Sequence, residues 1–403
     1  MPSHARTRRM KDQEWMFDKI IASGGPDFYW PMTEETLSAV GVDASGDIRT
    51  ARASIRKFLD LTPEMVRIGE KREALAREAE AEAHKETARD NFFTAACFYT
   101  MAQGPIHEDG NALNVRLSAR KNECYAGFIR HASRPIEAVE IPFEGKSLPG
   151  YLHRPAHAVG RIPCIVFLGG MDNFKELLVT NPVDKFLDRG MAVLAFDGPG
   201  QNEARISRGI CVTADNFVTA GKAAMDFLMA RSDIDAARIG ITGISMGSFW
   251  LTQIVAHDPR YKAAAGFYVC HENGMNTIFN EANPMFKDRY MWMAGYDDEA
   301  KFDEFAKTLT LEGLGPRVRC PYLMVAGEDE DLSPIAHSYK LYNEIAGPKM
   351  IVVYKGERHG VSDNLDVRAF IADWFTDRFA GKKMESRRIR KDCRTGREIG
   401  GGA

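Results

Sequence analysis

The sequence lacks the patterns that indicate membrane spans, disulfide frameworks and secretion. No apolar run approaches the about 20 residues that a membrane-spanning helix needs. The seven cysteines form no C-x-x-C pair, and several lie in apolar runs, so we expect reduced, mostly buried thiols. The N-terminal stretch is charged and has no apolar segment typical of a secretory signal. These absences together favour a cytoplasmic protein.

Signals for metals, nucleotides and polyanions are missing as well. There is no H-E-x-x-H motif, no histidine pair at ligand spacing, and no phosphate-binding glycine loop after a predicted strand. The 53 Lys and Arg residues nearly balance the 56 Asp and Glu residues, with a net charge of −3. That balance gives no reason to expect nucleic acid or an anionic membrane as partner. We therefore expect no cofactor, no metal, no nucleic acid and no membrane partner.

The sequence divides into two parts that differ in amino-acid composition. Residues 1–135 are rich in Ala, Glu, Lys and Arg and predict an all-helical N-terminal domain, which we expect to cover the carboxyl ends of the strands as a cap. Residues 136–381 alternate apolar strand-like runs with helical stretches, which predicts an α/β fold with a mostly parallel, doubly wound sheet. Residues 271–316 interrupt this alternation as a Met-rich insert that we expect to form a pocket wall, although ordinary helix packing explains it equally well. The basic, Gly-terminated residues 382–403 are expected to be disordered.

The strongest chemical signal is the stretch "RIGITGISMGSFW", which contains G-x-S-x-G between a predicted strand and a predicted helix. Small residues on both sides of Ser245 allow a sharp turn that exposes its hydroxyl group. The N–H of Met246, at the start of the helix, can then face a developing oxyanion. We predict that Ser245 is a nucleophile.

A serine nucleophile needs a base and a group that orients the base. His359, in "MIVVYKGERHG", is the histidine that follows a late strand in a compact loop. The acid should follow the strand "PYLMVAG", where four acids occur in a row. The usual register of this loop selects Glu330, but aspartate is commoner in the role, so Asp331 and Asp329 stay open. The chain order Ser, acid, His is the order of α/β-hydrolases.

A second oxyanion donor should come from an early strand end. "CIVFLGGMDNFKE" places Gly169, Gly170 and Met171 directly after an apolar strand. We assign one N–H group to Gly170, with Met171 next in line.

The segments "FLGGMDNFKE" and "LDRGMAVLAFDGPGQNEAR" resemble one particular group of α/β-hydrolases. This group includes 2,6-dihydroxypseudooxynicotine hydrolase and the fungal polyketide-shortening (yellowish-green pigment) hydrolases. Its members also carry an all-helical N-terminal domain, and the resemblance covers most of residues 90 to 380. It implies Ser245 and His359 as triad members, and it aligns Glu330 with a position where the group normally has aspartate.

The resemblance implies retro-Claisen hydrolysis, in which a C–C bond next to a carbonyl is cleaved in a 1,3-dicarbonyl, acyl-aromatic or polyketide-like substrate. A carboxylesterase or lactonase would use the same triad, and an acyltransferase or a ligand-binding receptor on this fold stays open. Candidate substrate-binding residues are Met171, Trp292 of the insert, and Glu272, for which a capping or salt-bridged role is the alternative. Because helical arms often dimerise, a homodimer is expected.

Overall fold

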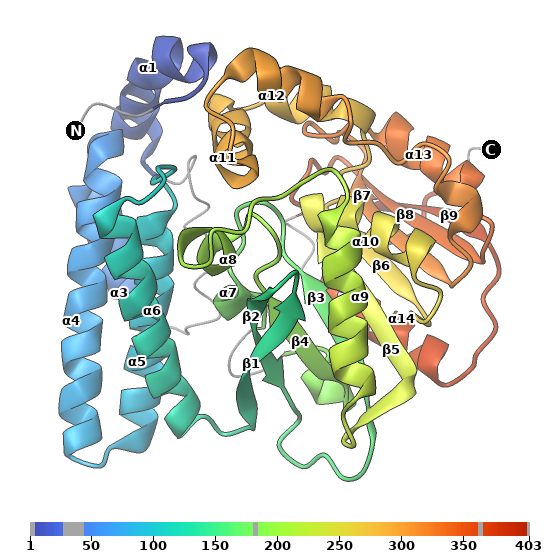
Figure 1. Cartoon of the computed structure of the whole chain (residues 1–403), viewed down its shortest axis with the longest axis horizontal. Coiled ribbons are helices and arrows are strands. Elements are labelled where there is room, and N and C mark those ends of the chain that lie inside the picture. Colours follow the sequence, from blue (N-terminus) through green and yellow to red (C-terminus); the bar gives the residue numbers. More distant parts are fainter. Residues whose placement is uncertain (1–4, 27–43, 180–183, 362–365, 401–403) are drawn as a thin grey trace.

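The computed structural model describes residues 5–26, 44–179, 184–361 and 366–400, which form a helical layer beside an α/β sheet (Figure 1). Every described element that precedes the first strand is a helix. These elements are α1 (Arg8–Gly24), α3 (Ser45–Ser54), η3 (Phe58–Asp60), α4 (Leu61–Ala81), α5 (Lys85–Gln103) and α6 (Ala112–His131). None of the described helices is long and apolar enough to cross a membrane.

One sheet of nine strands follows, in the order β1-β2-β4-β3-β5-β6-β7-β8-β9. The strands are β1 (Ile136–Phe143), β2 (Lys146–His153), β3 (Ile162–Leu168), β4 (Ala192–Phe196), β5 (Ile234–Ile244), β6 (Ala264–Phe267), β7 (Tyr322–Gly327), β8 (Lys349–Lys355) and β9 (Arg387–Asp392). Strand β2 runs antiparallel to both β1 and β4, and all other neighbours are parallel. This is the mostly parallel α/β sheet that the sequence predicts.

Helices cover both faces of the sheet, as strand alternation requires. In β3, Val166 belongs to the apolar core shared with α9 and α10, whereas Phe167 belongs to the opposite core shared with α14. Both side chains are buried, because a doubly wound sheet packs a layer on each face. The connecting elements are α7 (Lys175–Leu178), η4 (Leu187–Arg189), α8 (Asn202–Ile206), α9 (Asn216–Met229), α10 (Met246–His257), α13 (Ile335–Glu344) and α14 (Asp366–Phe379).

The helical layer rests on loops that leave the carboxyl ends of the strands. Helix α5 contacts α7, which follows β3, and α6 contacts α8, which follows β4. The ring of Tyr125 on α6 lies 4.4 Å, centroid to centroid, from the ring of Tyr151 on β2. In open parallel sheets this edge is where ligands bind, so the helical layer lies beside the candidate site.

The Met-rich insert folds into short helices that pack against the sheet domain. They are η5 (Asn273–Met275), η6 (Thr277–Glu281), α11 (Pro284–Ala294), α12 (Glu299–Ala306) and η7 (Gly315–Arg317). Met275, Tyr290, Met291 and Met293 are fully buried in the main apolar core. Much of the apolar character of the insert therefore serves helix packing, and its role as a pocket wall stays a prediction.

The C-terminal tail differs from the expectation of disorder. Residues 387–392 form β9, which pairs in parallel with β8 along its whole length, while residues 401–403 lie outside the described part of the chain. Ile389 points into the core beside α14, and Arg390 forms a 2.6 Å ion pair with Glu328. The guanidinium of Arg388 lies over the ring of Tyr342. The basic residues thus find acidic and aromatic partners at a sheet edge whose backbone groups need pairing.

Candidate active site

Ser245 lies on a sharp turn between β5 and α10. Its backbone has φ 55° and ψ −124°, a conformation that is strained for a non-glycine residue. A Cβ on Gly243 would lie 2.3 Å from the carbonyl oxygen of Gly247, and one on Gly247 would lie 2.6 Å from that of Leu168. The G-x-S-x-G pattern is therefore a steric requirement of this turn.

Ser245, His359 and Glu330 contact one another in a chain. His359 Nε2 lies 2.9 Å from Ser245 Oγ, and His359 Nδ1 lies 2.7 Å from Glu330 Oε1. The Glu330 side chain is fully buried, and its Oε1 also accepts a hydrogen bond from the backbone N–H of Leu332. Because a carboxylate only accepts, Nδ1 carries the hydrogen, and the Nε2 lone pair of the neutral ring faces the serine hydroxyl.

The structure brings Glu330 to the imidazole ring and places the other two acids elsewhere. Asp331 Oδ1 accepts from the backbone N–H of His359 at 3.4 Å, while its half-exposed carboxylate lies 3.8 Å from Arg358. Asp329 is held through its backbone, whose N–H donates to the carbonyl of Glu357. Of the acids that the sequence leaves open, only Glu330 contacts the ring within the described part of the chain.

The surroundings of His359 raise its pKa. Burial alone lowers this pKa, but the charge and hydrogen bond of Glu330, with the nearby charges of Asp331 and Asp172, raise it above the ordinary value. The imidazolium that forms when Ser245 loses its proton is stabilised by the same charges.

The loop that follows β3 lies beside Ser245, but the N–H group of Gly170 in this loop already has an acceptor. A Cβ on Gly170 would lie 3.1 Å from Ser245 Cβ, so this loop touches the nucleophile. The Gly170 N–H donates to Asn173 Oδ1 at 2.7 Å, because the loop turns back on itself at Asn173. Gly170 is therefore not free to act as the oxyanion donor assigned from sequence. The N–H of Met171 has no acceptor among the described residues, and that of Met246 opens α10, where helix geometry supplies no acceptor.

The predicted substrate-binding residues have other partners. Glu272 is buried, and its Oε2 accepts from the N–H of Thr277 at 2.9 Å, while its Oε1 lies 3.9 Å from His337 Nε2. The bond from Thr277, the first residue of η6, is a capping role, which the sequence left as one of the alternatives. Trp292 is 3% exposed, and its indole stacks on the ring of His107 from the helical layer.

Arg289 is a contact residue that sequence reasoning missed. It is buried on α11, and its Nε donates to the carbonyl of Met171 at 3.1 Å. The same guanidinium donates to the carbonyl of Gly104 in the helical layer. A single arginine thus joins the insert, the loop after β3 and the helical layer, and only the three-dimensional arrangement reveals it.

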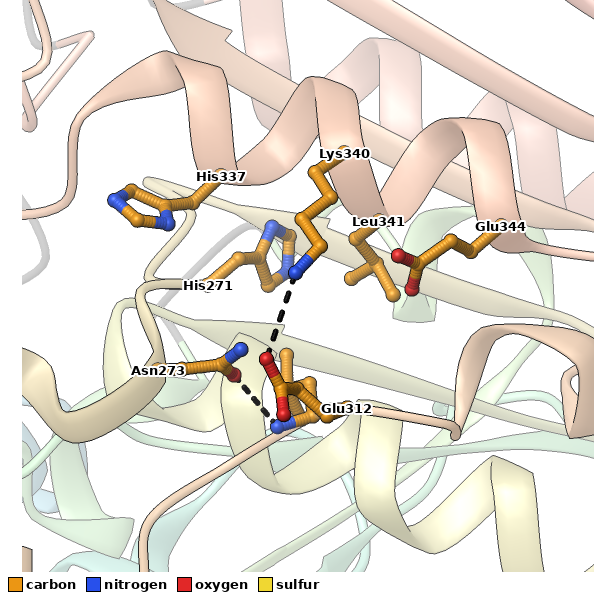
Figure 2. Close-up of a pocket in the computed structure, with 8 residues that line it drawn as sticks. His271, Asn273, Glu312, His337, Lys340, Leu341 and Glu344 are labelled. Carbon is orange, nitrogen blue, oxygen red and sulfur yellow. Dashed lines mark hydrogen bonds and ion pairs between the residues drawn. The ribbon is translucent and has the colours of Figure 1, made fainter. Parts of the chain in front are cut away.

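A small cavity lies beside the loop that follows β6 (Figure 2). Its volume is about 20 Å³, and one of its walls is His271, whose Nδ1 lies 2.9 Å from Ser338 Oγ. The other lining residues are Asn273, Leu311, Glu312, His337, Lys340, Leu341 and Glu344. This space suits a single water molecule, so it is too small for an organic substrate.

Within the described ranges, no group of three or more His, Cys, Asp or Glu side chains is placed to hold a metal ion. The seven cysteines are free thiols.

Comparisons with known proteins agree with this architecture. A model of the prolyl oligopeptidase family matches residues 182–382. The chain is 27% identical to 2,6-dihydropseudooxynicotine hydrolase of Paenarthrobacter nicotinovorans, over 66% of this chain and 71% of the relative. It is 32% identical to the alpha/beta hydrolase psoB of Aspergillus fumigatus, over 55% of this chain and 54% of the relative. The alignment thus spans about half the length of this fungal relative.

Solved structures show the same fold. The crystal structure of 2,6-dihydroxy-pseudo-oxynicotine hydrolase superposes with a TM-score of 0.75 at 23% identity, covering 88% of this chain and 99% of the other. AbyA5 superposes with a TM-score of 0.67 at 16% identity, covering 86% of this chain and 93% of the other. At these identities the likeness speaks for the fold alone. The fold, the named hydrolases among its relatives and the family match together identify this chain as an enzyme of the α/β-hydrolase class, homologous to 2,6-dihydropseudooxynicotine hydrolase and to fungal alpha/beta hydrolases.

Proposed function

We propose that this enzyme is a serine-dependent hydrolase that cleaves a C–C bond next to a carbonyl group, by a retro-Claisen reaction. The observation that carries the serine mechanism is the continuous contact from Ser245 Oγ through His359 to the buried Glu330. In this proposal Ser245 is the nucleophile, His359 the general base and Glu330 the residue that orients and stabilises the imidazolium.

The first half of the reaction forms an acyl-enzyme. Ser245 Oγ attacks one ketone carbonyl of a 1,3-dicarbonyl or acyl-aromatic substrate while His359 takes the hydroxyl proton. The N–H groups of Met246 and Met171 donate to the resulting oxyanion. When the tetrahedral intermediate collapses, the C–C bond breaks and its electron pair is delocalised into the second carbonyl or a phenolic ring. His359 returns its proton to that carbanion, and the leaving ketone or arene departs.

The second half consumes water. His359 removes a proton from water, whose oxygen attacks the acyl-enzyme, and Ser245 leaves with the proton returned by His359. The sum is one substrate and one water giving a carboxylic acid and a ketone or arene. A water activated directly by His359 would give the same products without the covalent step.

The choice of bond rests on the resemblance, since the triad serves C–C and ester substrates alike. An ester or lactone passes through the same tetrahedral oxyanion. The "LGG-x-D-x-x-KE" and "DGPGQ-x-E" stretches of this chain carry the resemblance to C–C hydrolases and polyketide-shortening hydrolases, and that resemblance favours the C–C bond. Met171 and Trp292 remain proposed substrate contacts, while Glu272 is assigned no chemical step because its carboxylate already accepts from Thr277.

Product analysis by mass spectrometry tests the bond specificity. Purified enzyme is given an aryl 1,3-diketone and a matched aryl ester, with Ser245→Ala as the control. We expect the diketone to yield a carboxylic acid and a methyl ketone, and the variant to yield neither. Ester turnover with the diketone untouched would contradict C–C cleavage and make the enzyme an esterase.

A further inference from the structure

A buried cluster of charged side chains joins the helical layer to the loop that carries Gly170. Lys121 of α6 is fully buried, and its Nζ donates to Oε1 of Glu176 on α7 at 2.6 Å. The Glu176 side chain is also fully buried, and the same oxygen accepts from Lys175 Nζ at 2.7 Å. Charges are rarely placed out of water in this way, because desolvation opposes it unless the partners are held in good geometry.

The other side of the cluster is fixed to the sheet. Lys175 Nζ also contacts Asp197 Oδ2 at 3.2 Å and Glu203 Oε2 at 2.7 Å. The backbone N–H of Lys175 donates to Asp197 Oδ1 at 3.1 Å. Asp197 directly follows β4, so α7 is held between the sheet on one side and Lys121 on the other.

The charge balance of the cluster depends on Lys121. In its absence, Lys175 would face the three carboxylates of Glu176, Asp197 and Glu203, with Arg208 as a further cation beside Glu203. Burial raises the pKa of Glu176, yet the two ammonium groups together lower it below its ordinary value. Without Lys121, Glu176 would compete with two other acids for one lysine and would no longer be drawn towards α6.

Helix α7 has only four residues, and so short a helix is not stable by itself. Tertiary contacts set the position of α7, and the position of α7 in turn constrains the loop that precedes it. Asn202 Nδ2 donates to the carbonyl of Asn173 at 2.6 Å, and Gln201 Nε2 donates to that of Gly170 at 2.6 Å. Because a peptide unit is planar, the bond to the Gly170 carbonyl also orients the N–H of Met171, while α7 constrains the other end of the same loop.

We propose that Lys121 is a positioning residue for catalysis: through Glu176 it fixes α7 and the loop 169–173, so that the oxyanion site is complete only when the helical layer is docked. This inference rests on the proposed function, because it assigns the loop a role in holding the oxyanion. Lys121 acts through Glu176 and does not touch the substrate.

Two kinetic quantities test the positioning role of Lys121. An aryl trifluoromethyl ketone adds to Ser245 and forms an oxyanion that resembles the transition state, so its KI reports the oxyanion site. Lys121→Met should lower kcat about 100-fold and raise this KI by a similar factor, while KM changes little, because a displacement of about 1 Å at a reacting site has this effect.

The double variant Lys121→Met/Glu176→Gln separates positioning from stability. Removing both charges leaves no unpaired buried charge, so Tm should recover relative to Lys121→Met. Without the ion pair that fixes α7, kcat and KI should stay impaired. Recovery of kcat and KI together with Tm would overturn the proposal, as would a rise in KM with kcat unchanged.

Lys287→Met is the matched control. Lys287 is a buried lysine of α11 that pairs with Glu299 and Asp303, at 2.9 and 2.6 Å. Its replacement should lower Tm without raising KI, and an equal rise in KI would contradict a specific role for Lys121. If the wild-type enzyme neither turns over carbonyl substrates nor binds the ketone, the proposed function fails. An active wild type with unaffected Lys121 variants overturns this inference alone.

Discussion

Replacement of Ser245 by alanine should lower kcat about 10⁶-fold, the scale seen when a serine protease loses its nucleophile. Alanine removes the atom that lies 2.9 Å from His359 Nε2, so no acyl-enzyme forms. What remains is the activity that the backbone donors and substrate binding provide on their own. Steady-state kinetics with the better of the two carbonyl substrates measures the loss.

Ser23→Ala is the control for this substitution. Ser23 lies on α1 and donates only to backbone carbonyls of its own helix, so its loss should leave kcat unchanged. A Ser245→Ala enzyme that folds as the wild type and keeps a large share of kcat would refute the covalent mechanism, and catalysis by a water on His359 would then replace it.

Replacement of Glu330 by glutamine should lower kcat about 10⁴-fold, as in serine proteases whose triad acid becomes an amide. The amide carries no charge to stabilise the imidazolium, and it no longer selects the tautomer whose Nε2 lone pair faces Ser245. The pH dependence should change too. His359 acts as a base only when it is neutral, so activity appears as the pH rises through its pKa, which Glu330 holds above the ordinary value. Glu330→Gln should therefore move this acid limb to lower pH, in a profile of kcat/KM against pH.

Asp331→Asn is the comparison that distinguishes the two neighbouring acids. Asp331 accepts a hydrogen bond from the backbone N–H of His359 and does not contact its imidazole ring. We therefore expect Asp331→Asn to cause a far smaller loss of kcat and only a small shift of the acid limb of the pH profile. The reverse order of effects, with Asp331→Asn the more damaging, would show that the acid acts from position 331.

The sharp turn at Ser245 was predictable because its requirements are local. Glycines on both sides of Ser245 are needed for steric reasons that a short sequence stretch records. The positions of His359 and the acidic loop followed from a second local fact, that each comes after an apolar strand of a parallel sheet.

The choice between Glu330 and Asp331 could not be made from sequence alone. Adjacent residues on a loop differ in direction, and direction depends on how the loop packs. The same holds for Gly170, because the bond from its N–H to Asn173 depends on how the four-residue turn 170–173 folds.

Features that join distant segments left no sequence signal. Lys121 is one lysine in a charged helix, and its partner Glu176 lies 55 positions away. The expectation that the C-terminal tail is disordered was wrong for a related reason. In the sequence its basic residues resemble solvent-exposed residues, and only the structure shows that this segment pairs with β8 and that Arg390 pairs with Glu328.

Labelling with a fluorophosphonate, followed by peptide mass spectrometry, tests the central claim most directly. The account predicts a single phosphonylated site at Ser245 in the wild-type enzyme, with labelling slowed in Glu330→Gln and absent in Ser245→Ala. Folded wild-type protein that stays unlabelled, or that is labelled at another serine, would contradict a mechanism based on Ser245, His359 and Glu330.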